Sequence, residues 1–335
     1  MRSQHDLLLK VENLETSFDL GSRVVKAVNG VSFTVKKGKT LGVVGESGCG
    51  KSVTAHTILQ LLPRLGKINA GHITYYGKEE AVVLNRLERN GRKMRSIRGK
   101  EIGMIFQDPM ASLNPVYTIG NQICEALLQH DAMSKKEAAD RAVEMLSLLG
   151  IPSARARLKD YPHQFSGGMK QRVMIAMAMV CNPKLLIADE PTTALDVTIQ
   201  AQILELMKDV QKKYDTSVIL ITHNMGIVSD MADEVAVMYM GKIVEFGTVE
   251  QVLSRPQHPY TRALLRSVPV LGIRRNMRLE TIRGSTPDPS EMPEGCAFAP
   301  RCDFATDRCR SAPPQTDEGQ GHLVRCWNLE EVRKG

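Results

Sequence analysis

The sequence predicts an α/β fold in which buried strands carry a phosphate-binding site at one edge of a sheet. An apolar strand at 41–44 leads into a glycine-rich loop and then into a helical pattern. A second apolar strand, at 184–188, ends in two adjacent carboxylates, Asp189 and Glu190. Near-continuous apolar strands are typical of a buried parallel sheet, which binds ligands at the carboxyl ends of its strands. The 335 residues, 42% of them hydrophobic and 24% charged, suffice for a large globular domain and a smaller one.

The glycine-rich loop at 45–52 has the pattern G-x-x-x-x-G-K-S in the strand–loop–helix setting of a phosphate-binding loop. Glycines let backbone N–H groups turn towards phosphate oxygens, and the helix N-terminus adds partial positive charge. Lys51 would reach the β- and γ-phosphates of a nucleotide, and the Ser52 hydroxyl would ligate Mg²⁺. The setting makes a chance glycine-rich turn the weaker interpretation. The candidate ATP-binding residues here are Gly45, Glu46, Ser47, Gly48, Cys49, Gly50, Lys51, Ser52 and Val53.

The ends of the other strands supply the remaining groups of a hydrolytic site. Asp189 is expected to hold Mg²⁺ through water, and Glu190 to polarise an attacking water. A β-branched strand at 217–222 delivers His223 to the same edge. A single histidine after a strand is more often structural, but its position where the phosphates should lie favours a functional role.

Two helical segments carry apolar stripes that indicate core packing. The segment 134–150 opens with a capping box, Ser134 to Glu137, and stops at Gly150. The segment 198–210 has one apolar face, formed by Ile199, Ile203, Met207 and Val210. Neither stripe needs a functional role.

The net charge of +7 comes from scattered lysines and arginines without a long basic run, which favours a solvated surface over a nucleic-acid site. The N-terminal stretch lacks the apolar region of a signal peptide. The longest apolar run, 173–181, is far shorter than the roughly 20 residues of a membrane-spanning helix. We therefore expect a cytoplasmic protein without a span of its own.

Together with the stretch FSGGMKQR at 165–172, these motifs resemble those of ATP-binding cassette (ABC) ATPases over about residues 7–250. The resemblance implies a P-loop (RecA-like) core with an antiparallel β subdomain and a helical signature subdomain at about 108–182. It also implies a second anion-binding helix N-terminus, which binds the γ-phosphate of ATP on a partner ATPase. The residues of this signature are Ser166, Gly167, Gly168 and Met169. The family more often has leucine in place of Phe165 and glutamine in place of Met169.

Further roles follow from the resemblance alone. Gln107 matches a glutamine that contacts Mg²⁺ and senses the membrane partner, so that the implied Mg²⁺ set is Ser52, Gln107 and Asp189. His223 matches a switch histidine that contacts the γ-phosphate. Phe18 matches an aromatic residue that stacks on adenine, although a core position is the alternative. The loop that crosses to the other ATPase contains Ala194, Leu195 and Asp196.

The stretches FQDPMASLNP, YPHQFSGGM and HPYTRALL are similar to those of oligopeptide and dipeptide importer ATPases. So is an extension at 266–335, which follows the ATPase domain at 1–265. The resemblance implies an ATP-hydrolysing subunit, peripheral on the cytoplasmic side of the membrane, that powers import of di- or oligopeptides. Its partners would be two permeases, a second ATPase that is a homologous but different chain, and an extracytoplasmic substrate-binding protein. Related members import nickel or oligosaccharides, which stays an alternative.

Two other classes of function compete with an importer subunit. Ribosomal cassette proteins usually carry two cassettes, whereas this sequence has a single P-loop. Chromosome and repair members carry a long coiled coil between P-loop and signature, and the interval 52–166 has no sustained heptads. A regulator that binds nucleotide without turnover would not need both Glu190 and His223.

Four of the seven cysteines lie in the last forty residues: Cys296, Cys302, Cys309 and Cys326. A reducing cytoplasm disfavours disulfides. A bound metal can cross-link a segment that is too polar to form an apolar core of its own. Four thiolates suit Zn²⁺ or an iron–sulfur cluster, and the close C-x2-C pairs of structural zinc sites are missing. Peptide-importer ATPases carry a [4Fe–4S] cluster on a similar extension. We expect a structural [4Fe–4S] cluster, with Zn²⁺ as second candidate and four ordinary cysteines as the remaining alternative.

Overall fold

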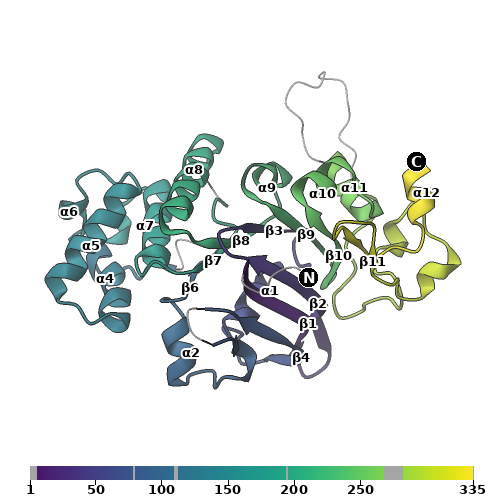
Figure 1. Ribbon diagram of the computed structural model, residues 1–335, viewed down its shortest axis with the longest axis horizontal. Helices are drawn as coiled ribbons and strands as arrows, with labels where there is room; N and C mark the ends of the chain where they lie inside the picture. The colour runs from purple at the N-terminus through teal and green to yellow at the C-terminus, as the bar shows by residue number, and fades with distance from the viewer. Residues whose placement is uncertain (1–5, 78–79, 109–111, 194, 268–281, 335) are drawn as a thin grey trace. The chain divides into compact units, whose positions relative to one another are not determined.

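The computed structural model describes residues 6–77, 80–108, 112–193, 195–267 and 282–334 (Figure 1). The chain forms two compact units, each assembled from separate stretches of sequence. The first contains residues 1–9, 35–40 and 75–221, and the second contains residues 10–34, 41–74 and 222–335.

The first unit contains three neighbouring parallel strands, which are β6 (Ile102–Ile105), β7 (Leu185–Asp189) and β8 (Ser217–Thr222). Ile102 lies opposite Leu185, and Leu185 lies opposite Ser217. Every residue of β7 and β8 is buried, which explains their nearly unbroken apolar sequences. The strands predicted before the carboxylate pair and before His223 are therefore confirmed.

The helices of the first unit follow the predicted patterns. In α5 (Lys135–Leu148) the Ser134 hydroxyl accepts the Glu137 N–H at 3.2 Å, and the Glu137 carboxylate accepts the Ser134 N–H at 2.7 Å. The predicted capping box is therefore confirmed. Buried residues of α8 (Val197–Tyr214) include three of the predicted stripe, Ile203, Met207 and Val210. The remaining helices are α2 (Arg92–Ile97), α4 (Ile119–His130), α6 (Ala154–Arg157) and α7 (Gly167–Met179), and α4, α5 and α7 pack on one another (Figure 1).

The main sheet of the second unit combines parallel and antiparallel strands. β3 (Thr40–Val44) runs parallel to β9 (Glu234–Tyr239), and β9 pairs antiparallel with β10 (Lys242–Thr248). Two short strands from the end of the chain, β12 (Leu323–Val324) and β11 (Thr316–Asp317), continue the sheet beyond β10 (Figure 1). The C-terminal segment is thus part of the sheet that carries the glycine-rich loop.

The second unit also contains strands of a separate sheet and further helices. Strands β1 (Leu7–Asp19), β2 (Val24–Lys36) and β4 (Gly66–Tyr75), which lie mainly in this unit, belong to a separate sheet; β5 (Val82–Val83) is in the first unit. The helices are α1 (Lys51–Ile58), α9 (Met225–Met231), α10 (Val249–Ser254), α11 (Pro259–Arg266) and α12 (Leu329–Lys334). Among the described residues, no helix combines the length and apolar character needed to cross a membrane.

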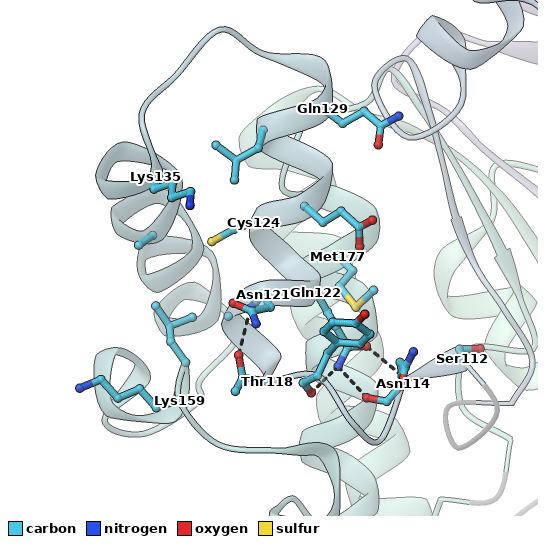
Figure 2. A pocket seen from close by; sticks show the side chains of 16 residues that line it. Ser112, Asn114, Thr118, Asn121, Gln122, Cys124, Gln129, Lys135, Lys159 and Met177 are labelled. Carbon is cyan, nitrogen blue, oxygen red and sulfur yellow. Dashed lines mark hydrogen bonds between the residues drawn. The ribbon is translucent and has the colours of Figure 1, made fainter.

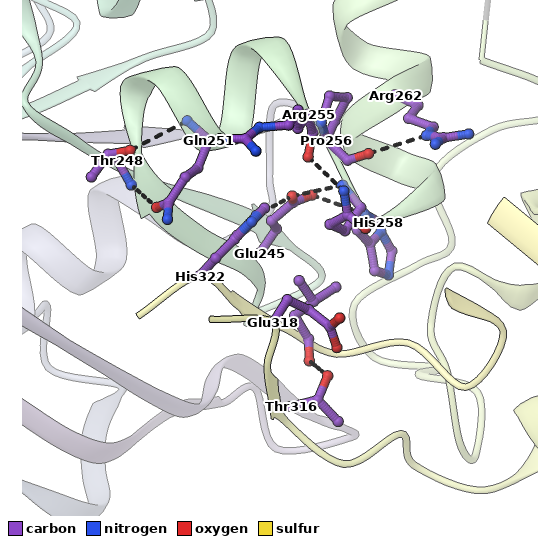
Figure 3. A network of polar contacts seen from close by, with 12 residues as sticks. Glu245, Thr248, Gln251, Arg255, Pro256, His258, Arg262, Thr316, Glu318 and His322 are labelled. Atoms are coloured by element: carbon purple, nitrogen blue, oxygen red, sulfur yellow. Dashed lines mark hydrogen bonds and ion pairs between the residues drawn. The ribbon is translucent and has the colours of Figure 1, made fainter. Parts of the chain in front are cut away.

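A buried polar network ties the C-terminal segment to β10 and to the start of α11 (Figure 3). The fully buried Glu245 carboxylate accepts the N–H groups of Gln257 at 2.8 Å and His258 at 2.9 Å. It also accepts a hydrogen bond from His322 Nε2 at 2.8 Å. His258 Nδ1 accepts the Tyr260 N–H at 3.1 Å, and burial lowers the pKa of His258 to about 4. The carboxylate is therefore satisfied by three partners, two adjacent N–H groups at the start of α11 and one distant histidine side chain.

Candidate nucleotide-binding site

The glycine-rich loop lies between β3 and α1, as the sequence predicts. Gly45, Gly48 and Gly50 have φ values of 152°, 79° and 103°, a region that favours glycine. A Cβ on Gly45 would lie 2.1 Å from the Met238 carbonyl oxygen, and one on Gly50 would lie 2.3 Å from that of Ala27. Both ends of the loop therefore require glycine because neighbouring backbone packs directly against them.

Lys51 carries the positive charge of this loop. It is 5% exposed, and its ammonium donates to the carbonyl oxygens of Gly45 at 2.8 Å and Glu46 at 3.0 Å. The neighbouring Cys49 is buried, and burial raises the pKa of its thiol. The charge of Lys51 and the N-terminus of α1 lie at the same turn, which suits the binding of a polyphosphate.

A carboxylate inside this loop, Glu46, is neutralised by Arg301 from the C-terminal segment. Arg301 Nη1 and Nη2 donate to the two carboxylate oxygens at 2.7 and 3.0 Å. The Thr286 hydroxyl donates to the same carboxylate at 3.2 Å. Hydrogen bonding to Glu46 raises the pKa of the Arg301 guanidinium. Arg301 is not among the site residues predicted from the sequence, although an acidic residue in a phosphate-binding loop is itself a signal that a cation lies near it.

The predicted metal and water-handling residues of the first unit meet at the end of β7. Asp189 is 2% exposed, and Glu190 turns out of the strand with a φ of 47°. The Glu190 carboxylate accepts hydrogen bonds from the Thr193 hydroxyl at 2.8 Å and from Gln107 Nε2 at 3.2 Å. The Glu190 N–H donates to the Ile221 carbonyl oxygen at 2.9 Å. The structure therefore brings together Gln107 and Glu190, which are far apart in the sequence.

The predicted signature lies at the N-terminus of α7. The Ser166 hydroxyl accepts the Met169 N–H at 3.3 Å, which caps the helix. A Cβ on Gly168 would lie 2.9 Å from Ile199 Cγ2, so glycine permits close packing against α8. Ser166 and Gly167 are exposed, and the start of a 13-residue helix is therefore accessible to an anion.

The remaining predicted residues occupy separate positions. Asp196 caps α8 by accepting the N–H of its third residue at 3.0 Å, and Leu195 is half-buried. Ala194 lies outside the described residues. His223 directly follows β8 and is exposed, and Phe18 is half-buried near the end of β1.

The four C-terminal cysteines are buried or half-buried free thiols. Burial raises the pKa of Cys302 to about 12 and that of Cys326 to about 11, and negative charge on the neighbouring thiols contributes to both shifts. Asn328 donates from its backbone to Cys326 Sγ at 3.4 Å and from its side chain to Cys309 Sγ at 3.5 Å. These thiols form no disulfide. Among the residues that the structure describes, no three or more His, Cys, Asp or Glu side chains converge as a ready-made metal site.

A cavity of about 1180 Å³ lies between helices of the first unit (Figure 2). The buried Gln122 side chain holds the loop at its rim, donating to the carbonyl oxygens of Asn114 at 3.0 Å and Tyr117 at 2.9 Å. Its Oε1 accepts the Asn114 N–H at 2.9 Å. The loop leaves Val116 73% and Tyr117 53% exposed. Exposed apolar side chains of this loop therefore lie beside the cavity.

Comparison with known proteins identifies the family. A family model described as ABC transporter matches residues 28–193, and one described as oligopeptide/dipeptide transporter, C-terminal region, matches residues 244–309. The chain is 54% identical over 328 residues to the dipeptide transport ATP-binding protein DppD of Bacillus subtilis, covering 97% of this chain and 96% of that protein. This chain belongs to the ABC transporter family, as an ATP-hydrolysing subunit of the oligopeptide/dipeptide type.

Other relatives of this ABC ATPase agree with that assignment. The oligopeptide transport ATP-binding protein OppD of Bacillus subtilis is 52% identical over 324 residues, which cover 96% of this chain and 89% of that protein. Among solved structures, the dimeric post-hydrolysis state of the ATP-binding cassette MJ0796 bound to ADP and Pi matches with a TM-score of 0.62. The two chains are 27% identical, and the match covers 72% of this chain and 98% of the MJ0796 chain. The second family model begins in β10 and spans three of the four C-terminal cysteines.

Proposed function

We propose that this ABC ATPase powers the import of di- or oligopeptides across the cytoplasmic membrane. The observation that carries the proposal is similarity over nearly the whole chain to dipeptide and oligopeptide transport ATP-binding proteins. The match to the peptide-transporter C-terminal region supports it further. Nickel or oligosaccharides are the alternative substrates, because related ATPases serve such importers.

The residues of the P-loop bind ATP, and the end of β7 handles Mg²⁺ and water. Lys51 and the α1 N-terminus hold the β- and γ-phosphates. The resemblance implies that Ser52, Gln107 and Asp189 would hold Mg²⁺ through hydroxyl, amide and carboxylate oxygens, the ligands that suit a hard cation. Glu190 polarises the attacking water, and hydrogen bonds from the Gln107 amide and the Thr193 hydroxyl orient its carboxylate.

ATP hydrolysis requires two ATPase subunits that close on each other. The exposed α7 N-terminus at Ser166 binds the γ-phosphate of the ATP held by the partner, and the loop ending at Asp196 crosses to it. His223 contacts the γ-phosphate of its own subunit, and Phe18 stacks on the adenine. The second ATPase is a homologous but different chain.

The ATPase docks on the cytoplasmic side of the membrane against two permeases, which receive substrate from an extracytoplasmic binding protein. The cavity beside the loop of Tyr117 is the proposed docking surface, because this loop exposes apolar side chains and Gln122 holds its backbone. Gln107 lies on the segment between β6 and this loop, so movement at the permease reaches the Glu190 carboxylate through few residues.

The C-terminal cysteines hold a structural [4Fe–4S] cluster, with Zn²⁺ as the second candidate. Cys296, Cys302, Cys309 and Cys326 are free thiols of one short segment, and Asn328 donates N–H groups to the sulfurs of Cys309 and Cys326. Four thiolates could ligate an iron–sulfur cluster if the segment brought them together around it, and N–H hydrogen bonds to the sulfurs would stabilise it. The bound cluster would cross-link a segment that has little apolar core of its own.

Reconstitution of the complete complex tests the proposed import. The ATPase, its partner ATPase and the permeases are placed in liposomes with the substrate-binding protein, and uptake of labelled di- and oligopeptides, nickel and oligosaccharides is measured. Uptake of peptide that depends on ATP supports the proposal. Uptake of nickel or oligosaccharide without uptake of peptide would show that this protein serves the alternative class of importer. Co-purification with ribosomes instead of permeases would overturn the assignment as an importer subunit.

A further inference from the structure

The contact between Glu46 and Arg301 links the P-loop to a segment 255 residues later in the chain. The Arg301 side chain is 5% exposed and that of Glu46 is 25% exposed, so water weakens this pair less than an ordinary surface ion pair. The pair is bidentate, which fixes the direction of the Glu46 carboxylate as well as its charge.

The two partners are anchored by the same aromatic cluster. Tyr260 accepts the Glu46 backbone N–H on its hydroxyl at 2.8 Å. Phe298, three residues before Arg301, packs edge-on against Tyr239 at 5.3 Å and against Tyr260 at 5.4 Å between ring centroids. The short 3₁₀ turn Ala299–Arg301 then brings the guanidinium to the P-loop. The cysteine-bearing segment therefore holds the Glu46 side chain through Arg301, and through Phe298 it packs on Tyr260, which holds the Glu46 backbone.

Three further hydrogen bonds fix the guanidinium. Arg301 Nε donates to the Arg283 carbonyl oxygen at 2.8 Å, and Nη1 lies 3.3 Å from the Tyr239 hydroxyl and 3.5 Å from the Thr286 hydroxyl. A guanidinium with this many partners has one position available to it. The function of Arg301 is therefore better explained by its hold on the Glu46 carboxylate than by a general contribution of positive charge.

The position of Glu46 explains why a cation is needed. The Glu46 carbonyl oxygen accepts the Lys51 ammonium at 3.0 Å, so Glu46 and the phosphate-binding lysine belong to one small loop. A bare carboxylate there would repel the phosphates of ATP. We propose that the C-terminal segment is part of the ATP-binding machinery, with Arg301 as a positioning residue that neutralises Glu46 and holds the P-loop open to phosphate. The proposal rests on ATP binding by the P-loop and is independent of the transported substrate.

A double-mutant cycle in the full-length chain tests this proposal. We compare Arg301→Met, Glu46→Gln and the double variant for affinity to a fluorescent N-methylanthraniloyl ATP, and for kcat and KM of ATP hydrolysis in the assembled complex. Arg301→Met leaves an unpaired carboxylate and should raise the Kd at least about tenfold, mainly as a KM effect. In the Glu46→Gln background the same Arg301→Met change should have little effect, because the carboxylate to be neutralised is gone.

Arg310→Met is the matched control, because its side chain forms an exposed ion pair with Asp307 in the same segment. It should bind the ATP probe like the native protein. Arg301→Lys retains the charge without the bidentate geometry and should give a Kd between those of the native protein and Arg301→Met. It replaces Arg301→Met in the test if that variant does not fold. Binding of the probe by the native chain separately tests ATP binding itself.

Two results would overturn the proposal. One is an Arg301→Met or Arg301→Lys variant that unfolds at a lower temperature but binds ATP with native affinity, since that describes a merely structural contact. The other is an Arg301→Met effect of equal size in the native and Glu46→Gln backgrounds, which would place the action of Arg301 elsewhere.

Discussion

The Gln107 amide donates a hydrogen bond to the Glu190 carboxylate at 3.2 Å. Glu190, which we propose activates water, is thus in direct contact with Gln107, which we propose senses the permease. The Thr193 hydroxyl holds the same carboxylate oxygen at 2.8 Å. A change at the permease that displaces Gln107 would therefore alter the orientation of the catalytic carboxylate.

Glu190→Gln should retain ATP affinity and lower the turnover of the assembled complex at least about 10²-fold, because the amide has nearly the same shape but cannot act as a general base. It should also trap the two ATPases closed on ATP. Turnover and ATP binding are measured on the purified complex. Glu205→Gln, an exposed acid on α8, is the control and should behave like the native protein. Near-normal hydrolysis by Glu190→Gln would remove Glu190 from the catalytic role.

Gln122→Leu should uncouple transport from ATP binding. The substitution removes the three hydrogen bonds that shape the loop of Tyr117 at the cavity rim, each of which contributes about 1 kcal/mol. We expect peptide uptake to fall about tenfold or more while the Kd for ATP stays near the native value. Gln129→Leu, on the exposed side of the same helix, should have the smaller effect. Equal loss of uptake and of ATP affinity in Gln122→Leu would contradict the assignment of this surface.

The stability of the protein should fall as the pH drops from about 6.5 towards 4. His258 has a pKa of about 4 in the folded chain because it is buried, whereas an exposed histidine has a pKa of 6.5. Between these values the unfolded chain binds a proton that the folded chain does not, so acid favours unfolding. The loss from this group approaches about 3 kcal/mol at pH 4.

His258→Asn tests the origin of this acid sensitivity. Asparagine can still accept the N–H at the start of α11 but does not titrate. The free energy of unfolding, measured by denaturant titration at several pH values, should change less steeply with pH in this variant. His72→Asn replaces an exposed histidine and should leave the pH dependence native. An unchanged slope in His258→Asn would assign the sensitivity to other groups.

Protein purified without oxygen should be brown and contain about four irons per chain. Cys302→Ser should lose the colour and most of the iron, because it removes one of the four thiolates. Cys124→Ser, in α4, is the control and should retain both. Colourless anaerobic protein with one zinc would refute the cluster in favour of the second candidate, and protein without metal would return these residues to ordinary cysteines.

The sequence by itself determined the local chemistry of the nucleotide site. The glycine pattern at 45–52 predicts the loop between β3 and α1, and apolar runs predict the buried strands that end in Asp189 and before His223. The capping box at Ser134 likewise predicts the start of α5. These features can be predicted from the sequence because glycine conformation, strand burial and helix capping depend on residues within a few positions of one another.

Only the tertiary structure decided which distant side chains act together. Arg301 has no signal of its own in a sequence rich in arginine, yet it is the partner of Glu46. In the same way His322, just before β12, completes the Glu245 network, and Gln107, after β6, contacts Glu190 at the end of the neighbouring strand β7. Such pairs depend on sheet order and chain crossing, which are global properties. A charged side chain can therefore be recognised from the sequence, but its partner is chosen by the packing of the whole unit.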